Sequence, residues 1–181
     1  MPYGPRSGRS RRSFRNDCGS DRRRDLRAAD AAAAAAKERG LEGKFAVALI
    51  NTTGQAPLAV LTNRTTRERL QAASMARGSR GGEFDNRDEV VQLAKLRAER
   101  AALLGYPNYA AYSLENETAK DTAAVNKLLS ELAKPAVANA KKEAAEIQKV
   151  IDAEKGGFKV AAHDWAYYTD KVRAERFSFD E

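Results

Sequence analysis

The chain has 181 residues, of which 43% are hydrophobic and only five are proline, which excludes a chain that is disordered throughout. Its formal net charge of +7 resides mostly in residues 1–27, which hold nine arginines against three aspartates. The other residues carry 23 basic and 22 acidic side chains, so the body of the chain is close to neutral. Cys18 is the only cysteine, which excludes an intrachain disulfide and a thiolate metal cluster.

No apolar run approaches the roughly 20 residues that cross a bilayer, and no secretion signal is visible. We therefore expect a cytoplasmic protein without a membrane partner. Residues 1–24 mix Gly, Pro, Ser and Arg without an apolar period, which predicts a disordered basic tail. Such a tail can bind phosphate backbones without sequence preference, but a terminus without any role is the simpler interpretation, so nucleic acid is not the expected partner.

The first ordered element is predicted from Asp25 to Arg39, where the alanine-rich composition favours a helix that Gly40 ends. The stretch "KFAVALI" at 44–50 alternates in side-chain size and predicts a short, largely buried strand. Turn residues follow it, so a strand and turn segment is expected near 44–60. Further along, Thr65 and Thr66 are the expected caps of the next helix.

Residues 88–104 have the clearest helical pattern, and Asp85 or Asn86 is the expected cap of this helix. One arc of the helical wheel holds the apolar residues Val90, Leu93, Ala94, Ala101 and Leu104. This pattern is typical of a helix that faces a core, and Arg97 falls near the middle of the arc. We therefore predict that Arg97 is buried and bound by a carboxylate or carbonyl of another segment.

A rigid corner is predicted at "LLGYPNYAAY", residues 103–112. Gly105 stands where a helix end needs a left-handed backbone, Pro107 prevents continuation of the helix, and Asn108 can cap a new one. A long helix should then begin at Asp121 or Thr122. Pro135 predicts either a kink within that helix or two helices that meet there.

The last helix is expected after Gly156 and Gly157, with Asp164 as its cap. Trp165, Tyr168 and Val172 should line one side of it. Taken together, these elements predict an all-α fold, in which residues 25–181 form one helical, non-catalytic portion of a larger domain.

Catalytic chemistry is hard to find in the residues themselves. His163 is the only histidine, so a histidine-based zinc site is not expected, and a surface or capping position is the simplest interpretation. The glycine-rich "RGSRGGEF" at 77–84 lacks the lysine and the strand that a phosphate loop needs. Glu115 and Glu117 are expected to be solvated. The tyrosines and the tryptophan form either a peptide-contacting surface or ordinary packing.

Four stretches carry a resemblance to a known family: "LINTTGQAPLAVLTNRTTRERL", "LRAERAALLGYPNYAAY", "GGF" at 156–158 and "HDWAYYTDKVRAERFSFDE". They resemble the bacterial peptidyl-dipeptidases of the thimet oligopeptidase and neurolysin family of zinc metallopeptidases, over about residues 25–181. Two departures stand out: residues 1–20 do not resemble the family, and His163 stands where a tryptophan is expected.

The resemblance implies a helical enzyme that cleaves oligopeptides and releases C-terminal dipeptides. In such enzymes a His-Glu-x-x-His motif and a downstream glutamate hold zinc, and the motif glutamate activates the attacking water. Those elements lie C-terminal to the matched part, so we expect no catalytic, cofactor-binding or metal-binding residue in this chain. The expected partner is the missing C-terminal catalytic part, and the chain alone is expected to be inactive. The alternative is a stand-alone helical module with a nucleic-acid-binding arm.

Overall fold

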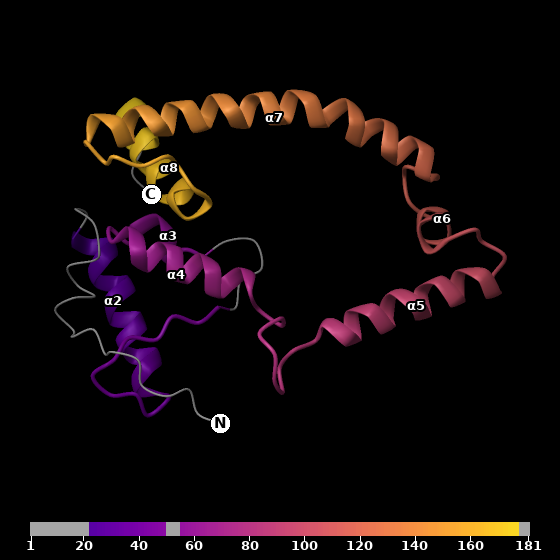
Figure 1. Cartoon of the computed structure of the whole chain (residues 1–181), viewed down its shortest axis with the longest axis horizontal. Helices are drawn as coiled ribbons and strands as arrows, with labels where there is room; N and C mark the ends of the chain where they lie inside the picture. The colour runs from indigo at the N-terminus through magenta and orange to yellow at the C-terminus, as the bar shows by residue number, and fades with distance from the viewer. Residues whose placement is uncertain (1–21, 50–54, 178–181) are drawn as a thin grey trace. The chain divides into compact units, whose positions relative to one another are not determined.

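The computed structural model describes residues 22–49 and 55–177, and side chains are described from Ala29 onward. This part of the chain is helical and contains no strand, which confirms the all-α prediction (Figure 1). Its helices are α2 (Arg22–Lys37), α3 (Pro57–Val60), α4 (Arg64–Met75), α5 (Arg87–Leu103), α6 (Tyr109–Leu114), α7 (Thr122–Ala153) and α8 (Ala162–Phe177). The expected tail lies outside the described residues up to position 21, and residues 22–24 begin α2.

The strand expected over 44–50 is not formed by residues 44–49, and residue 50 lies outside the described part. No neighbouring strand pairs with this segment among the described residues, and the Ala46 amide instead donates to the Ala32 carbonyl of α2 at 2.9 Å. Alternating side chains favour a strand only where a second strand accepts its backbone hydrogen bonds. The second half of the expected segment contains the short helix α3.

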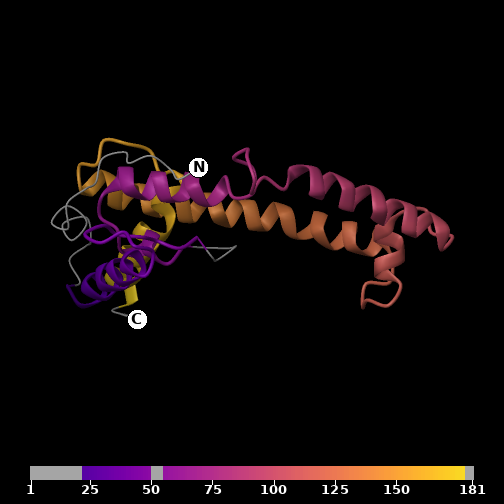
Figure 2. The same ribbon diagram turned by 90° about the horizontal axis from the view of Figure 1, so that it is seen from below.

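The described chain divides into two compact units, Met1–Met75 with Ala144–Glu181, and Ala76–Glu143. In the first unit, α8 packs against α3 and α4, and α3 packs against α2 (Figures 1 and 2). Its main core joins α7 to α8 through Ile147, Ile151 and Tyr168, with Trp165 and Val172 packed beside them. The apolar side predicted for the last helix is therefore confirmed.

Alanines give α2 its buried face. Ala29, Ala32 and Ala36 are spaced three and four apart, which places them on one side of the helix, and all are buried. A side with only methyl groups lets a neighbouring backbone approach closely. Helix propensity and small size therefore explain the same run of alanines.

The second unit begins with α5, the corner and α6. The corner prediction is confirmed: Gly105 has φ +81°, and the Tyr106 amide donates to the Ala101 carbonyl at 2.9 Å, which closes the helix in a Schellman motif. Asn108 caps α6 by accepting from the Ala111 amide at 2.9 Å. A helix end of this kind can be predicted from the sequence because its turn and cap residues are neighbours in the chain.

The long helix α7 begins at Thr122, where Asp121 accepts from the Ala124 amide at 2.8 Å. Pro135 lies inside this helix, so the prediction of two separate helices is wrong, and Figure 1 shows one continuous, bent ribbon. A proline leaves one carbonyl of the preceding turn without its amide partner. Residues around Pro135 are exposed, so water can hydrate that carbonyl and the helix continues.

The caps of α4 and α5 differ in part from those that the sequence predicts. The cap of α4 is Asn63 and not Thr65 or Thr66, because the Asn63 side-chain oxygen accepts from the Thr66 amide at 2.9 Å. At α5, Asn86 occupies the cap position without a side-chain cap bond, and Asp85 accepts from the Arg87 amide at 3.2 Å. A hydrogen bond from the Arg87 side chain lowers the pKa of Asp85 to about 2.

Candidate functional site: a buried arginine–aspartate cluster

Arg67 is the largest fully buried side chain of the described residues, with 1% of its surface exposed. Its guanidinium donates to the Leu61 carbonyl at 2.8 Å, the Thr62 carbonyl at 2.9 Å and the His163 carbonyl at 3.2 Å. A fourth hydrogen bond, 2.8 Å long, goes to Asp164 Oδ1. Four of the five guanidinium donors are thus satisfied, which is what makes burial of this charge tolerable.

Asp164 is fully buried and is the acceptor at the centre of the cluster. Besides Arg67, it binds Arg64, whose Nε and Nη2 lie 3.1 and 3.0 Å from Asp164 Oδ2. Asp164 Oδ2 also accepts from the Ala161 amide at 3.1 Å, so Asp164 binds the start of α8 from within its first turn, and the helix begins at Ala162, earlier than a cap at Asp164 would place it. We refer to Arg64, Arg67 and Asp164 as the buried cluster.

The electrostatics of Asp164 follow from these contacts. Burial alone would raise the pKa of its carboxyl group, but the hydrogen bonds from Arg64, Arg67 and the Ala161 amide outweigh burial and hold the pKa below its usual range. The carboxylate is therefore ionised at neutral pH and already fully bonded. It is poorly suited to act as a general base, because a base must release its partners to take a proton.

Aromatic rings complete the surroundings of both guanidinium groups. Arg64 Cζ lies 4.2 Å from the centre of the Phe158 ring, and Arg67 Cζ lies 4.3 Å from that of Tyr167. Cations over ring faces are stabilised by the ring quadrupole, most strongly where water is excluded. The cluster therefore ties the end of α3 and the start of α4 to the first turns of α8.

His163 lies beside the cluster rather than at the surface, with 11% of its side chain exposed, so the surface position expected for it is wrong. Its Nε2 atom is buried, makes no hydrogen bond to the described residues, and lies 3.5 Å from Asp164 Oδ2. A buried ring nitrogen without a hydrogen bond is a departure from ordinary packing.

The described residues do not fit a zinc site. They contain no group of three His, Cys, Asp or Glu side chains that could hold a metal ion. The one place where a histidine meets a carboxylate, His163 and Asp164, is also occupied by two guanidinium groups. A divalent cation there would be repelled by Arg64 and Arg67 at close range.

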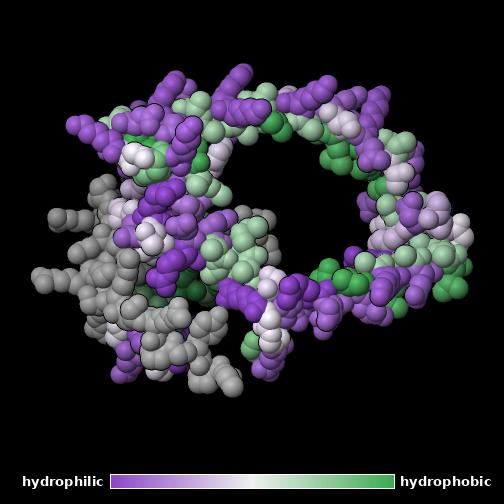
Figure 3. Space-filling view, in the orientation of Figure 1, coloured by the Kyte–Doolittle hydropathy of each residue, from purple (hydrophilic) through white to green (hydrophobic). Residues whose placement is uncertain are grey.

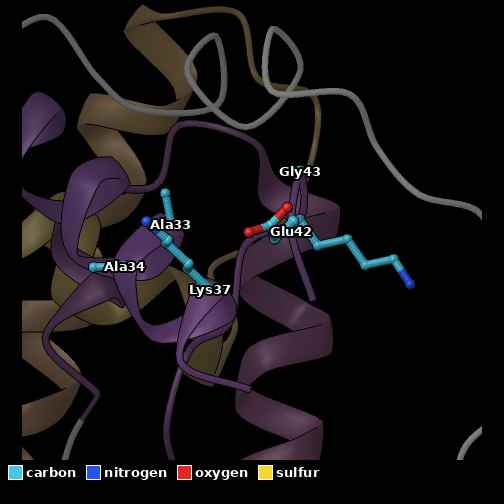
Figure 4. A pocket seen from close by; sticks show the side chains of 6 residues that line it. Ala33, Ala34, Lys37, Glu42 and Gly43 are labelled. Atoms are coloured by element: carbon cyan, nitrogen blue, oxygen red, sulfur yellow. The ribbon is translucent and has the colours of Figure 1, made fainter. Parts of the chain in front are cut away.

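A pocket of about 320 Å³ lies between α2 and the loop that follows it. Figure 4 shows Ala33, Ala34 and Lys37 of α2 and Glu42 of the loop among its lining residues. The charged side chains of this lining are exposed, as the burial of residues 37, 42 and 44 shows. The lining residues include no nucleophile paired with a base, so this pocket has no evident catalytic chemistry.

Arg97 does not occupy the buried position predicted for it. It is exposed, and its guanidinium lies 5.1 Å from the centre of the Tyr109 ring of α6. The arc of α5 around it is also uncovered, apart from Ala101. The wheel identified the apolar side correctly but could not show whether another segment covers that side.

The described aromatic residues contact one another and neighbouring side chains, as ordinary packing predicts, and the peptide-contacting surface stays a prediction. Tyr168 is buried in the core, and Tyr167 packs against it with ring centres 5.1 Å apart. At the corner, Tyr112 accepts from Arg100 at 2.9 Å, and Tyr106 donates to Glu115. Glu115 therefore has a partner, although it is exposed as predicted.

The sequence pattern does not single out Arg64 and Arg67, and it indicates Asp164 only as a helix cap. The available signal was their spacing: Arg64 and Arg67 are three residues apart, so both lie on one side of α4. Leu70 follows Arg67 by three residues and continues that side. A charged pair in line with an apolar residue can indicate a buried ion pair, but the partner almost 100 residues away is invisible in sequence.

Comparison with known proteins identifies a family. Residues 58–181 match the family described as Peptidase family M3, and this stretch contains the whole buried cluster. The chain is 44% identical over 150 residues to the dipeptidyl carboxypeptidase of Salmonella typhimurium and 41% identical over 150 residues to that of Escherichia coli. It is 32% identical over 158 residues to oligopeptidase A of Escherichia coli.

Each match covers most of this chain but only a small part of the relative. Each of the two dipeptidyl carboxypeptidases is matched by 83% of this chain, but only 22% of its own length is involved. For oligopeptidase A of Escherichia coli the shares are 83% and 23%. The chain thus spans less than a quarter of the length of these relatives. Among the described residues, no helix combines the length and apolarity needed to span a membrane.

Proposed function

The chain belongs to peptidase family M3, and we propose that it provides a non-catalytic, helical scaffold portion of a zinc-dependent peptidyl-dipeptidase. The observation that carries this proposal is the identity of 44% over 150 residues to a dipeptidyl carboxypeptidase. The sequence resemblance puts this portion N-terminal to the zinc motif of such enzymes. Catalysis would come from further M3 polypeptide, either continuous with this chain or separate from it.

The geometry of the buried cluster supports a structural role. Its carboxylate is fully bonded and its guanidinium groups are permanently charged, so the cluster can hold helices in place but cannot exchange protons with a substrate. The described residues do not fit zinc, so we assign no catalytic step to them. An oligopeptide would be the substrate of the complete enzyme, and a cytoplasmic location is part of the same proposal.

The comparisons do not support the stand-alone nucleic-acid-binding module, because the relatives are peptidases and none is named as a binding protein. Oligopeptidase A is the nearest alternative within the family. Its lower identity, 32% against 44%, favours the dipeptidyl carboxypeptidase assignment.

A chimaera tests the proposal. This chain would replace the matched segment of the Escherichia coli dipeptidyl carboxypeptidase, and cleavage of short peptides with a free carboxyl end would be followed by mass spectrometry. We expect release of C-terminal dipeptides that a zinc chelator abolishes, and no turnover by the chain alone. Internal cleavage without dipeptides would instead indicate an oligopeptidase, and chelator-sensitive turnover by the isolated chain would refute the scaffold assignment.

A further inference from the structure

An apolar stripe on α7 has no cover in the described structure. It consists of Val125, Leu128, Leu129, Leu132 and Ala136, which recur at spacings of three and four and therefore share one side of the helix. Leu128, Leu129 and Leu132 are 56%, 59% and 54% exposed. Figure 3 shows hydrophobic residues gathered along one edge of α7. We call these five residues the α7 stripe.

The C-terminal part of α7 shows how apolar residues at this spacing are buried by a neighbouring helix. Further along α7 the spacing continues to Ile147 and Ile151, which are 3% and 0% exposed because Tyr168 of α8 packs against them. The apolar residues of α7 are thus buried in the first unit, whereas in the second unit Leu128, Leu129 and Leu132 are exposed and Val125 is half-buried. Contiguous exposed apolar residues of this kind mark an interaction surface in soluble proteins.

The comparisons indicate what covers the α7 stripe. The family match includes the whole stripe, so the stripe belongs to the part shared with M3 peptidases. The relatives contain more than three quarters of their length outside the match. Resting on the proposed function, we propose that the α7 stripe is the docking surface for apolar helices of the remaining M3 peptidase polypeptide.

A second copy of this chain is the competing occupant. Residues 122–143 carry the lysines Lys127, Lys134, Lys141 and Lys142 against two glutamates. At about 100° per residue these lysines lie away from the α7 stripe, three of them on the opposite side of the helix, so their charge does not oppose a dimer through the stripe. The oligomeric state of the chain alone therefore distinguishes the two occupants in the test below.

Two matched substitutions test the proposal. Leu132→Asp places a carboxylate in the α7 stripe, whereas Ala138→Asp places one about 120° away around the same helix. Both positions are exposed, so neither change should alter the helix content or the unfolding midpoint of the chain alone, which circular dichroism would measure. The probe is the Escherichia coli dipeptidyl carboxypeptidase polypeptide without its matched segment, with binding measured by calorimetry.

We expect Leu132→Asp to weaken binding at least tenfold and Ala138→Asp to weaken it less than twofold. In the chimaera described above, Leu132→Asp should lower the unfolding midpoint far more than Ala138→Asp, a readout that needs no association step. Equal effects of the two variants on binding would overturn the proposal. A dimer of the chain alone that Leu132→Asp dissociates and Ala138→Asp does not would overturn it as well.

The two proposals can fail separately. A chimaera that folds with the expected sensitivity at Leu132 but releases no dipeptide contradicts the proposed function and supports the docking surface. A chimaera that releases dipeptides and tolerates Leu132→Asp as well as Ala138→Asp contradicts the docking surface and supports the function.

Discussion

At the scale of single residues, the buried charge in this fold is Arg67 and not Arg97. Both arginines occur in helices with an apolar side, and the sequence does not distinguish them without knowledge of what faces each helix. Arg67 is buried because three carbonyls and Asp164 accept from it. Among the residues that the structure describes, Arg97 contacts the face of the Tyr109 ring. The partner, rather than the helix, decides whether an arginine is buried.

We predict that Arg67→Met lowers the free energy of unfolding of the first unit by about 3 to 5 kcal/mol, because it leaves the Asp164 carboxylate buried with one partner fewer. Chemical denaturation followed by tryptophan fluorescence would report it through Trp165 of α8. Arg69→Met is the control, since Arg69 is exposed on the same helix and its loss should change stability by less than about 0.5 kcal/mol. Similar losses in both variants would contradict a special role of Arg67.

Asp164 gives the fold a defined response to acid. Its pKa is lower in the folded chain than the unfolded value of about 3.9, so its ionised form stabilises the fold fully above that value. This contribution should be lost as the pH falls through the lower, folded pKa. We predict that Asp164→Asn is less stable than the unchanged chain at pH 7 and that the difference narrows below about pH 4. Urea unfolding at several pH values would measure it, and a constant difference would contradict the prediction.

At the scale of helices, features that depend on neighbouring residues were mostly predicted correctly, whereas features that depend on contacts with distant segments were not. The Gly105 and Asn108 corner and the start of α7 at Asp121 or Thr122 were predicted, because each depends on residues within one turn of chain. The strand expected over 44–50 was wrong over residues 44–49, because strand formation needs a distant partner. The Thr65 or Thr66 cap was placed two or three residues too late, since Asn63 is also a good cap residue and accepts from the Thr66 amide.

The C-terminal end of α7 offers a test of backbone strain. Lys155 has φ +56°, a conformation in which a side chain is strained, and its amide closes the helix on the Asp152 carbonyl at 3.0 Å. We predict that Lys155→Gly raises the free energy of unfolding by about 0.5 to 1 kcal/mol. Lys149→Gly, in the regular part of the same helix, should lower it by about 1 kcal/mol. Thermal unfolding of both variants would check the opposite signs.

At the scale of the whole chain, the described helices differ in how much tertiary packing they have. Helix α8 and residues 144–153 surround a buried core, whereas α5 and residues 122–143 are exposed on almost all sides. The sequence predicted the apolar side of α5, but it could not show that the described chain leaves this side exposed. That depends on which other polypeptide is present.

We therefore predict a clear contrast in amide hydrogen exchange. Amides of α5 and of residues 122–143 should exchange much faster than those of α8 and residues 144–153, because isolated helices without packed sides open readily. Peptide-level mass spectrometry on the chain alone would measure this. Equal protection in both sets would mean that α5 and α7 are covered in solution.

The continuity of α7 constrains how this part of the chain can change in length. Within the second unit, the unbroken helical backbone keeps Leu128, Leu132 and Ala136 on one side of α7. One residue added between Leu128 and Leu132 would turn Leu132 by about 100° relative to Leu128, whereas seven added residues would turn it by only about 20°. Insertions and deletions in this part of α7 should therefore be tolerated mainly when their length, such as seven residues, returns the following side chains to nearly the same side of the helix.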